Sequence, residues 1–443
     1  MRAIRNTAVA LAGLVLMATA LVAPAGISQA ATATGKLTVA PGRAITAQFS
    51  GTKLDRRRLV SLEKSADGLT WSTLESVKMS SKGAVDFRTP ATQPGQYRAV
   101  AKEFTYKVKK KKVTAAEVVS EIRQLAAPSF ADEFTGSSLA DTWRTREEVG
   151  YQATGRLCSA PVSANATASG GSAVLTMTKA GATEAKKVAS QAKDRQKELD
   201  RAAVKKADAA VKKAESALAK AKAMKQKTAA QRKARSAAIR KADTALRRAK
   251  SARAALTPGC PNGVFHNAMV STQGSGETVR AGTVVARVKF SQGQGAHLGI
   301  WLQAGNRQEI DVIEAYGYGR GITNVLHRLS GSTLRKDPAV AKDAYVAVKT
   351  VKSKSWWSKW HTVAATFDTG TITFFLDGVK TRQLRGMAAA DYHLTMSVLS
   401  SDWETYRIKQ PDVRPGAGVA RSTVTRQSLP SLSVDWIRVW KKG

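Results

Sequence analysis

The stretch Glu309-Ile310-Asp311-Val312-Ile313-Glu314 decides how this 443-residue chain is interpreted. In a β-strand, residues two apart share a face, so Glu309 and Asp311 point one way and the isoleucine between them points into the opposite layer. Glu314 has the wrong parity for that face, and a one-residue bulge around Val312-Ile313 would restore it. The sequence therefore predicts a bulged strand with three carboxylates in one row on one face.

Three carboxylates in one row repel one another and would destabilise a strand with a purely structural role. Their presence calls for a reason, such as metal binding or acid–base chemistry. The spacing is short enough to arise by chance, but β-branched residues lie between the acids and further strand patterns surround them. The motif therefore favours a catalytic or metal-binding strand.

The segments around this strand have the alternating pattern of β-sheets that pack on one or both faces. Val284, Ala286 and Val288 share one face, and the residues between them share the other. Further strands are predicted at residues 362–367, 372–376, 394–399 and 434–440. Many strands and turns, with almost no helix outside one insertion, predict an all-β sandwich.

The insertion is a run of Ala, Lys and Arg at residues 183–257 without Gly or Pro. These residues favour helix, so the segment predicts one long helix or a helical hairpin that reverses near residues 225–228. Large apolar residues recur every seven positions from Val204 to Leu218, which gives two arms a thin, alanine-rich seam. The segment has 23 Lys and Arg against seven Asp and Glu, a net charge of +16.

The whole chain has a formal net charge of +38, so association with polyanions is expected. We expect the helical insertion to tether the chain to an anionic cell-wall polymer or to gather an acidic polysaccharide. The alternative is a solvated helical insertion with no partner. Nucleic acid is not an expected partner, because the N-terminus predicts secretion.

Residues 1–30 have the layout of a secretory signal peptide, with Arg2 and Arg5 before a long apolar stretch and small residues at its end. This predicts an extracellular protein, with cell-wall association as a further expectation and no membrane contact after cleavage. The alternative is an uncleaved membrane anchor. Outside the cell, the two cysteines of the sequence, Cys158 and Cys260, are expected to form a disulfide.

Residues 31–104 alternate like short strands separated by Asp-Gly, Lys-Gly and Pro-Gly turns. They predict a small antiparallel sandwich that resembles the immunoglobulin-like or fibronectin-type modules of bacterial exoenzymes. Residues 105–128, with a lysine run from Lys107 to Lys112, are expected to form a basic linker. A second domain is expected to occupy residues 129–443, interrupted by the helical insertion.

The acidic stretch resembles the E-[IL]-D-x-x-E signature of glycoside hydrolase family 16, which contains laminarinases, lichenases, agarases and carrageenases. The resemblance covers residues 129–443 apart from the insertion. The segments that carry it are Phe130-Ala131-Asp132-Glu133-Phe134, Gly299-Ile300-Trp301-Leu302, Trp360-His361-Thr362-Val363, Phe375-Leu376-Asp377-Gly378 and Val434-Asp435-Trp436-Ile437-Arg438-Val439-Trp440.

This resemblance implies a β-jelly-roll of two curved antiparallel sheets, with the substrate along the concave face. Carried over by position, it makes Glu309 the nucleophile, Asp311 the assisting acid and Glu314 the general acid/base of a retaining glycosidase. Such enzymes need two carboxyl groups about 5–5.5 Å apart, one ionised and one protonated. No cofactor is expected, and no dense Asp/Asn loop indicates a metal site.

Three further residues are candidates for substrate binding. Trp301 is expected either to stack on a sugar ring or to pack in the core. His327 resembles a position that reaches the family's catalytic cleft, with a structural role as the alternative, and Trp403 lies in a loop that resembles the cleft rim. The family's Trp-Pro-Ala-Phe-Trp stretch is reduced here to His297-Leu298-Gly299-Ile300-Trp301, a departure at positions that shape sugar subsites.

Together these features predict a secreted, retaining endo-glycosidase that cleaves a β-linked polysaccharide. A β-1,3-glucan is the expected substrate, because the bulged form of the signature resembles that of laminarinases. Two alternatives stay open. One is a non-catalytic glycan-binding protein on the same fold, and the other is a transglycosylase that passes the covalent intermediate to a sugar.

Overall fold

The computed structural model describes residues 35–50, 55–147, 158–254, 260, 263–291, 296–305, 308–316, 322–330, 333–336, 345–346, 357–385, 389–400 and 429–443. The signal peptide predicted for residues 1–30 lies outside the described residues.

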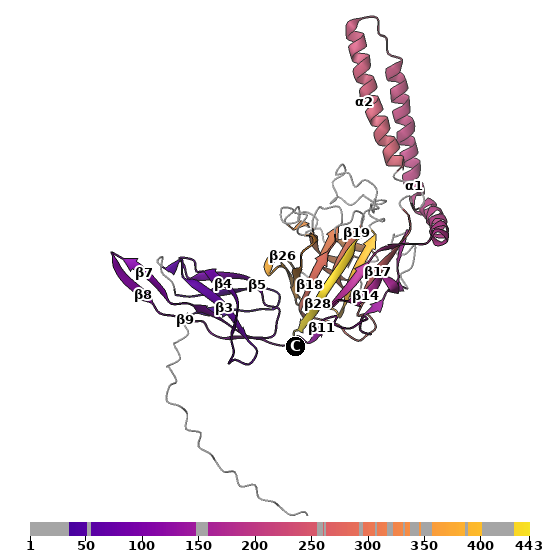
Figure 1. The fold of residues 1–443 in the computed structure, drawn as a ribbon. Helices are drawn as coiled ribbons and strands as arrows, with labels where there is room; N and C mark the ends of the chain where they lie inside the picture. Colours follow the sequence, from indigo (N-terminus) through magenta and orange to yellow (C-terminus); the bar gives the residue numbers. More distant parts are fainter. Residues whose placement is uncertain are drawn as a thin grey trace, which may run out of the picture.

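Two large β-sheets face each other in the C-terminal part of the chain (Figure 1). Within the described ranges, the first sheet has eight strands, with β11 (Phe130–Asp132) beside β28. The order of its other strands is β14 (Ala166–Ser169), β15 (Ser172–Thr176), β28 (Ser431–Lys441), β18 (Gly282–Phe290), β24 (His361–Phe367), β25 (Thr371–Leu376) and β26 (Val379–Arg385).

The second sheet has ten strands in the part of the chain that the structure describes. Its main order is β12 (Arg144–Thr145), β17 (Phe265–Ser271), β27 (Tyr392–Ser400), β19 (Ala296–Ala304), β20 (Glu309–Tyr316), β21 (Ile322–Ser330) and β22 (Thr333–Lys336). The short strands β13 (Ser159–Pro161) and β16 (Thr178–Lys179) pair with β17, and β23 (Tyr345–Val346) pairs with β21. A 3-10 turn, η3 (Ser163–Asn165), precedes β14.

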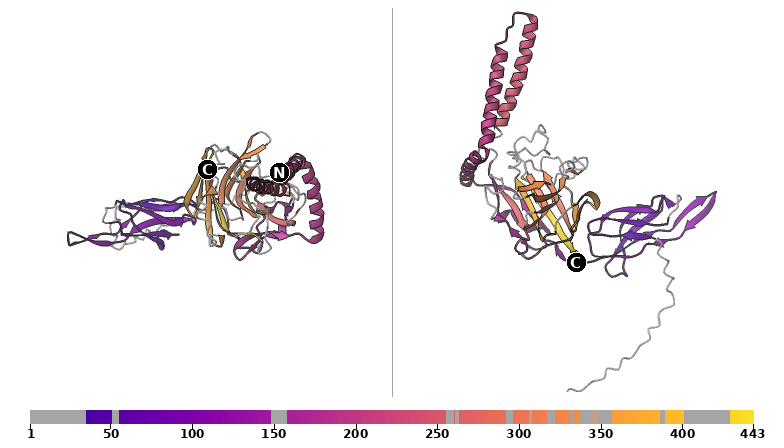
Figure 2. Two further views of the ribbon diagram at one scale, coloured as in Figure 1. Left: turned by 90° about the horizontal axis from the view of Figure 1, so that it is seen from above. Right: turned by 180° about the vertical axis from the view of Figure 1, so that it is seen from behind.

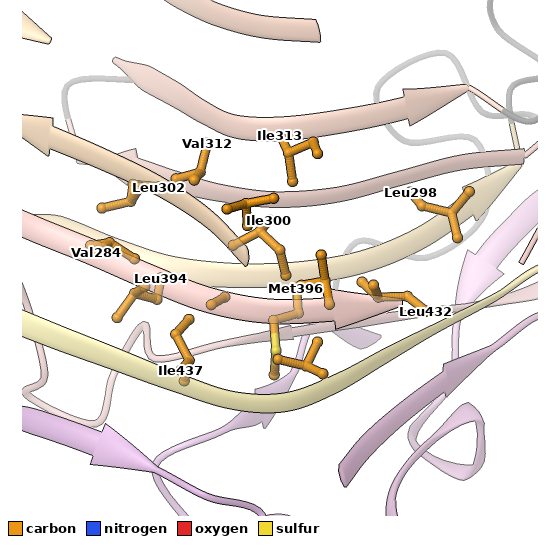
Figure 3. Close-up of a cluster of buried hydrophobic side chains, with 14 of the residues drawn as sticks. Val284, Leu298, Ile300, Leu302, Val312, Ile313, Leu394, Met396, Leu432 and Ile437 are labelled. Carbon is orange, nitrogen blue, oxygen red and sulfur yellow. The ribbon is translucent and has the colours of Figure 1, made fainter. Parts of the chain in front are cut away.

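The space between the two sheets is filled by apolar side chains from both of them (Figure 3). The labelled side chains are at most 1% exposed, namely Val284, Leu298, Ile300, Leu302, Val312, Ile313, Leu394, Met396, Leu432 and Ile437. Full burial of one such side chain is worth about 1.5–3 kcal/mol, so this layer dominates the stability of the sandwich. The all-β sandwich predicted for this part of the chain is confirmed.

The N-terminal part of the chain forms two smaller sheets that also enclose an apolar core. One contains β1 (Lys36–Thr38), β2 (Ala44–Gln48) and β5 (Ala84–Pro90). The other contains β10 (Arg123–Leu125), β6 (Gly95–Ala101), β3 (Leu59–Ser65) and β4 (Ser72–Lys78), with β9 (Val118–Val119) beside β6. Their inward residues include Ile45, Leu62, Phe87 and Tyr97, each at most 1% exposed.

The structure places strands in residues 105–128, where the sequence predicted a basic linker. β7 (Phe104–Val108) and β8 (Lys111–Ala115) form a hairpin whose turn residues, Lys109 and Lys110, have positive φ angles of 47° and 70°. After the hairpin, β9 and β10 return to pair with β6. Phe104, Tyr106 and Val108 alternate on one face of β7, and this pattern favours a strand. The lysines do not prevent the hairpin, because the exposed turn leaves their charges in water.

The N-terminal sheets pack on the outer face of the eight-stranded sheet. Val285, Phe375 and Trp436 lie in the same apolar cluster as the N-terminal core. Polar groups fix the junction, because the Arg438 guanidinium donates to both carboxylate oxygens of Glu133 and to the Thr92 carbonyl. Alternate residues of β18 therefore pack into two different cores. Val284 faces the core between the two large sheets and Val285 faces the N-terminal core, in agreement with the opposite faces predicted for them.

The insertion forms two helices, α1 (Ala182–Lys222) and α2 (Ala229–Ala254), which corresponds to the hairpin among the two predicted arrangements, and they project away from the sheets (Figures 1 and 2). Thr228 and Gln231 exchange hydrogen bonds between side chain and backbone at the start of α2, a capping box at the predicted reversal. The seam buries alanines such as Ala214, Ala221 and Ala242. Within the described residues, no helix has the length and apolar character needed to cross a membrane.

The base of the helical hairpin is held at several points. β16 and β17 pair directly, so the chain leaves the sheet at Lys179 and returns beside it at Phe265. His266 Nε2 lies 3.0 Å from Glu184 Oε2 in the first turn of α1. The predicted disulfide is present, since Cys158 and Cys260 are bonded with their Cα atoms 5.6 Å apart.

We predict that replacing Cys158 and Cys260 together by Ser lowers the free energy of unfolding by about 2–5 kcal/mol, because the bond closes a long loop in the unfolded chain. The sequence separation is 102 residues. Urea unfolding of the double variant and of the wild type, with and without reductant, measures this effect. Reductant should bring the wild type to the variant's stability and leave the variant unchanged; an effect of reductant on the variant would contradict the assignment.

We predict that Gly378→Ala weakens the junction between the N-terminal sheets and the sandwich. Gly378 has a φ of 79°, and an added Cβ would lie 2.6 Å from the Ala44 nitrogen, which donates to the Gly378 carbonyl. Gly171 is a matched control, with a φ of 73° and nothing within 4 Å of an added Cβ. By urea unfolding, Gly171→Ala should cost about 1 kcal/mol and Gly378→Ala about 1–2 kcal/mol more. Equal costs would show that the close approach is unimportant.

Candidate active site

The predicted bulge in β20 is present. On the neighbouring strand β19, Gln303 lies opposite Glu309, Trp301 opposite Asp311, and Gly299 opposite Glu314. The three positions on β19 are each two residues apart, whereas Glu314 follows Asp311 by three residues. β20 therefore contains one extra residue between Asp311 and Glu314, which is a β-bulge. The register on the other side, with β21, shifts at the same place. The extra residue brings the three carboxylates onto one face.

Burial of the intervening residues shows how the bulge achieves this. Ile310, Val312 and Ile313 are all at most 1% exposed and belong to the core between the sheets. Val312 and Ile313 both reach that core although they are consecutive in the chain (Figure 3). Asp311 is 3% exposed and Glu314 is 6% exposed, whereas Glu309 is half-buried.

Glu314 has a hydrogen-bond partner that the sequence reasoning did not identify. His297 Nε2 lies 2.7 Å from Glu314 Oε1, with side-chain exposures of 16% and 7%. His297 precedes Gly299 by two residues on β19 and therefore shares its face. Two features of the sequence pointed to His297. It lies an even number of residues from Trp301 and so shares its face, and it replaces the first Trp of the Trp-Pro-Ala-Phe-Trp stretch of the family that the sequence resembles.

Trp301 lies on the acid-bearing face and is only half-buried, outside the core between the sheets. Its Nε1 donates to Ser397 Oγ at 3.1 Å, which fixes the plane of the indole. The ring approaches Gly299, where an added Cβ would lie 3.3 Å from Trp301 Cδ1. The half-exposed ring on this face fits the cleft position predicted for Trp301 better than the alternative of core packing.

Strand β27 adds polar residues to the same face. His393, Thr395 and Ser397 lie opposite Gln303, Trp301 and Gly299 in the β19–β27 register. Thr395 Oγ1 donates to Ser271 Oγ on the next strand. His393 Nδ1 is buried and has no hydrogen-bond partner among the described residues. His393 was also missed in the sequence, because its placement depends on the pairing of β27 with β19.

His327 and His361 lie on different sheets of the sandwich. His327 occupies the position on β21 that pairs with Glu309, which brings its backbone next to the predicted nucleophile. Trp403 lies outside the described residues. His361 is on the other sheet, where its Nδ1 lies 2.8 Å from Asp377 Oδ2. Two separate segments of the family resemblance thus meet through this contact.

The face as a whole can support acid–base chemistry at a carbohydrate. Three carboxyl groups lie in one row, one of them against an imidazole, and an oriented indole lies beside them. Carboxyl groups in unequal environments are the arrangement that lets one ionise while another keeps its proton. In the part of the chain that the structure describes, no group of three or more His, Cys, Asp or Glu side chains is arranged to hold a metal ion.

Comparison with known proteins gives a family match and several solved structures. A comparison with curated proteins gives no match. The laminarinase catalytic domain of Thermotoga maritima MSB8 is 13% identical, with 71% of this chain and 98% of that chain covered and a TM-score of 0.42. The catalytic domain of the endo-1,3-β-glucanase (laminarinase) of Thermotoga petrophila RKU-1 is 12% identical, with 71% of this chain and 97% of that chain covered and a TM-score of 0.42. The laminarinase of Flavobacterium sp. UMI-01 is 11% identical, with 71% of this chain and 100% of that chain covered and a TM-score of 0.39.

The family model for "Glycosyl hydrolases family 16" matches residues 223–421. That range contains β19, β20 and β27, the strands that build the acid-bearing face. Over this range the chain is similar to glycoside hydrolase family 16.

Proposed function

We propose that this protein is a secreted, retaining endo-glycosidase that hydrolyses a β-linked polysaccharide. The observation that carries the proposal is the bulge of β20, which presents Glu309, Asp311 and Glu314 as one row. A regular strand would have placed Glu314 in the apolar core. A binding protein would have no need of this row, so the bulge favours an enzyme over the non-catalytic alternative.

In the first step of the proposed mechanism, a carboxylate oxygen of Glu309 attacks the anomeric carbon. The glycosidic bond breaks as Glu314 transfers its proton to the leaving oxygen, and a glycosyl ester forms. The near-complete burial of Asp311 beside both glutamates matters here, because its negative charge disfavours a second ionised group next to it. Asp311 therefore favours a protonated Glu314 before reaction.

In the second step, Glu314 acts as a base. Its carboxylate accepts a proton from water, the water oxygen attacks the anomeric carbon, and the ester bond to Glu309 breaks. The sugar leaves with its original anomeric configuration, because two displacements occur at one carbon. A transglycosylase would differ only in the acceptor, with a sugar hydroxyl in place of water.

We propose a β-1,3-glucan as the substrate. The support is the bulged form of the acidic signature, which resembles that of laminarinases. Trp301 offers a half-buried ring against which a glucose unit can stack. The proposed subsites also include His327 and Trp403, taken from the family resemblance.

The proposed organisation of the chain is a signal peptide, an immunoglobulin-like unit, the catalytic sandwich and the inserted helical hairpin. The Tyr97 hydroxyl donates to the Gln93 carbonyl at 2.6 Å, which resembles the tyrosine corner of immunoglobulin-like sandwiches. Burial raises the pKa of Tyr97 to about 12, so this donor keeps its proton at physiological pH. The layout of residues 1–30, which predicts a signal peptide, supports the proposed extracellular location.

We further propose that the helical hairpin binds an anionic cell-wall polymer. Its segment has a net charge of +16, and most of the described Lys and Arg side chains along α1 and α2 are exposed. Ion pairs such as Lys250 with Glu215 and Arg253 with Asp208 use few of these cations. The projecting, positively charged surface supports contact with a polyanion outside the catalytic face.

We predict that Glu309→Gln and Glu314→Gln each lower hydrolysis of the preferred polymer at least about 1,000-fold, because each removes one of the two essential carboxyl groups. Reducing-sugar release from β-1,3-glucan, mixed-linkage glucan, agarose, carrageenan and galactan measures the loss and identifies the substrate. The control is Asp435→Asn, whose carboxylate binds Arg287 Nη1 on the other sheet. Binding without hydrolysis by the wild type would instead favour a glycan-binding protein, and longer products would favour a transglycosylase.

We predict that replacing residues 183–257 by a short Gly/Ser linker weakens binding to poly(glycerol phosphate) about 10-fold or more and leaves hydrolysis unchanged. The pairing of Thr178 with His266 allows a short connection at this place. Binding measured between 50 mM and 500 mM salt should show a steeper salt dependence for the wild type. A matched variant with lysines of α1 changed to Gln tests charge without deletion. Unchanged polymer binding in both variants would exclude the tether.

A further inference from the structure

His297 contacts the side chain to which the proposed mechanism assigns both proton transfers. The Nε2–Oε1 distance to Glu314 is 2.7 Å, and both side chains are largely withdrawn from solvent. The residue directly opposite Glu314 is Gly299. His297 lies two positions before Gly299 on β19 and therefore on the same face, from which its imidazole reaches the carboxyl group.

The surroundings give the two ends of the acid row different partners. Besides His297, titratable residues at register positions on this face are Glu309, Asp311, Glu314 and Tyr316 on β20, with Tyr316 opposite His297. The neighbouring strands add His327 on β21, His393 on β27 and Arg144 on β12. His393 lies opposite Gln303, at the Glu309 end, and His327 on β21 pairs with Glu309. His297 lies within hydrogen-bond distance of Glu314, the group whose charge changes twice in one cycle of the proposed mechanism.

Resting on the proposed function, we infer that His297 is a positioning residue whose Nε2–H donates to Glu314 Oε1 throughout the reaction. Oε1 then serves as the fixed acceptor, and Oε2 carries the proton that moves to the leaving oxygen. As the glycosidic bond breaks and this proton departs, negative charge develops on Glu314. The donor from His297 interacts more strongly with that carboxylate than with the neutral acid, so it stabilises the transition state.

The same bond gives the reaction a defined pH dependence. A donor to the ionised form of a carboxyl group makes the proton easier to remove. Removal of the donor should therefore make Glu314 hold its proton to higher pH. It should also lower the rate, because the developing carboxylate is no longer stabilised.

The test compares two substitutions of His297 in the full chain, with kcat and KM measured from pH 4 to pH 10 on the polymer that the wild type cleaves. His297→Leu removes the donor, so kcat should fall about 100-fold with little change in KM, and the alkaline limb should move up by about one pH unit. His297→Gln keeps an amide donor at a similar reach. It should restore most of kcat and return the alkaline limb toward that of the wild type.

His361→Leu is the matched control, because His361 makes a similar contact at 2.8 Å with Asp377, on the other sheet. It should lower the unfolding temperature without moving either limb of the pH profile. If His297→Leu lowered activity and left the alkaline limb in place, as His361→Leu should, His297 would have a structural role and the inference would be overturned. The proposed function would stand in that case.

A spectroscopic readout keeps the inference testable without turnover. The His297 imidazole N–H should give a downfield proton resonance that is absent in His297→Leu and shifts or exchanges away in Glu314→Ala. Persistence of the resonance at its original position in Glu314→Ala would overturn the assigned donation. If the wild type had no activity on any polymer, the proposed function would be refuted. The resonance does not depend on turnover, so it would still show whether His297 donates to Glu314.

Discussion

Strand β20 supplies apolar side chains to the core on one face and a row of carboxylates on the other, and a regular strand with this sequence cannot do both. Its inner face supplies Ile310, Val312 and Ile313 to the core between the sheets, and its outer face supplies three carboxylates. The period of two places Glu314 on the wrong face unless one residue is added. The extra residue resolves this conflict, and both the core packing around Val312 and the row of acids follow from it.

The features that the sequence predicted well are those set by local periodicity. The bulge follows from the parity of acidic and apolar residues within six positions, and the opposite faces of β18 follow from simple alternation. The reversal near Thr228 was one of the two arrangements expected for the helix-forming segment, and a capping pair begins α2 there. In each case neighbouring residues contain the whole signal.

The features that the sequence did not reveal depend on which strands pair. His297 reaches Glu314 only through the register of β19 with β20, and His393 joins the face only through β27. The lysine run from Lys107 to Lys112 was interpreted by its charge, yet the flanking alternation makes a hairpin there. Cross-strand register is fixed by non-local packing, so a single sequence gives the candidate residues but not their contacts.

The two sheets of the sandwich use their outer faces differently, which separates chemistry from support. The ten-stranded sheet leaves its outer face to the acids, while the eight-stranded sheet covers its own with the N-terminal sheets through residues such as Val285 and Trp436. The N-terminal sheets consequently lie on the side of the sandwich away from the acids. Their packing and the Arg438–Glu133 contact stiffen the eight-stranded sheet, against which the core side of β20 is pressed. A rigid core under the bulge is what holds the carboxylates of Asp311 and Glu314 in place, because a loosely packed strand would let the register relax.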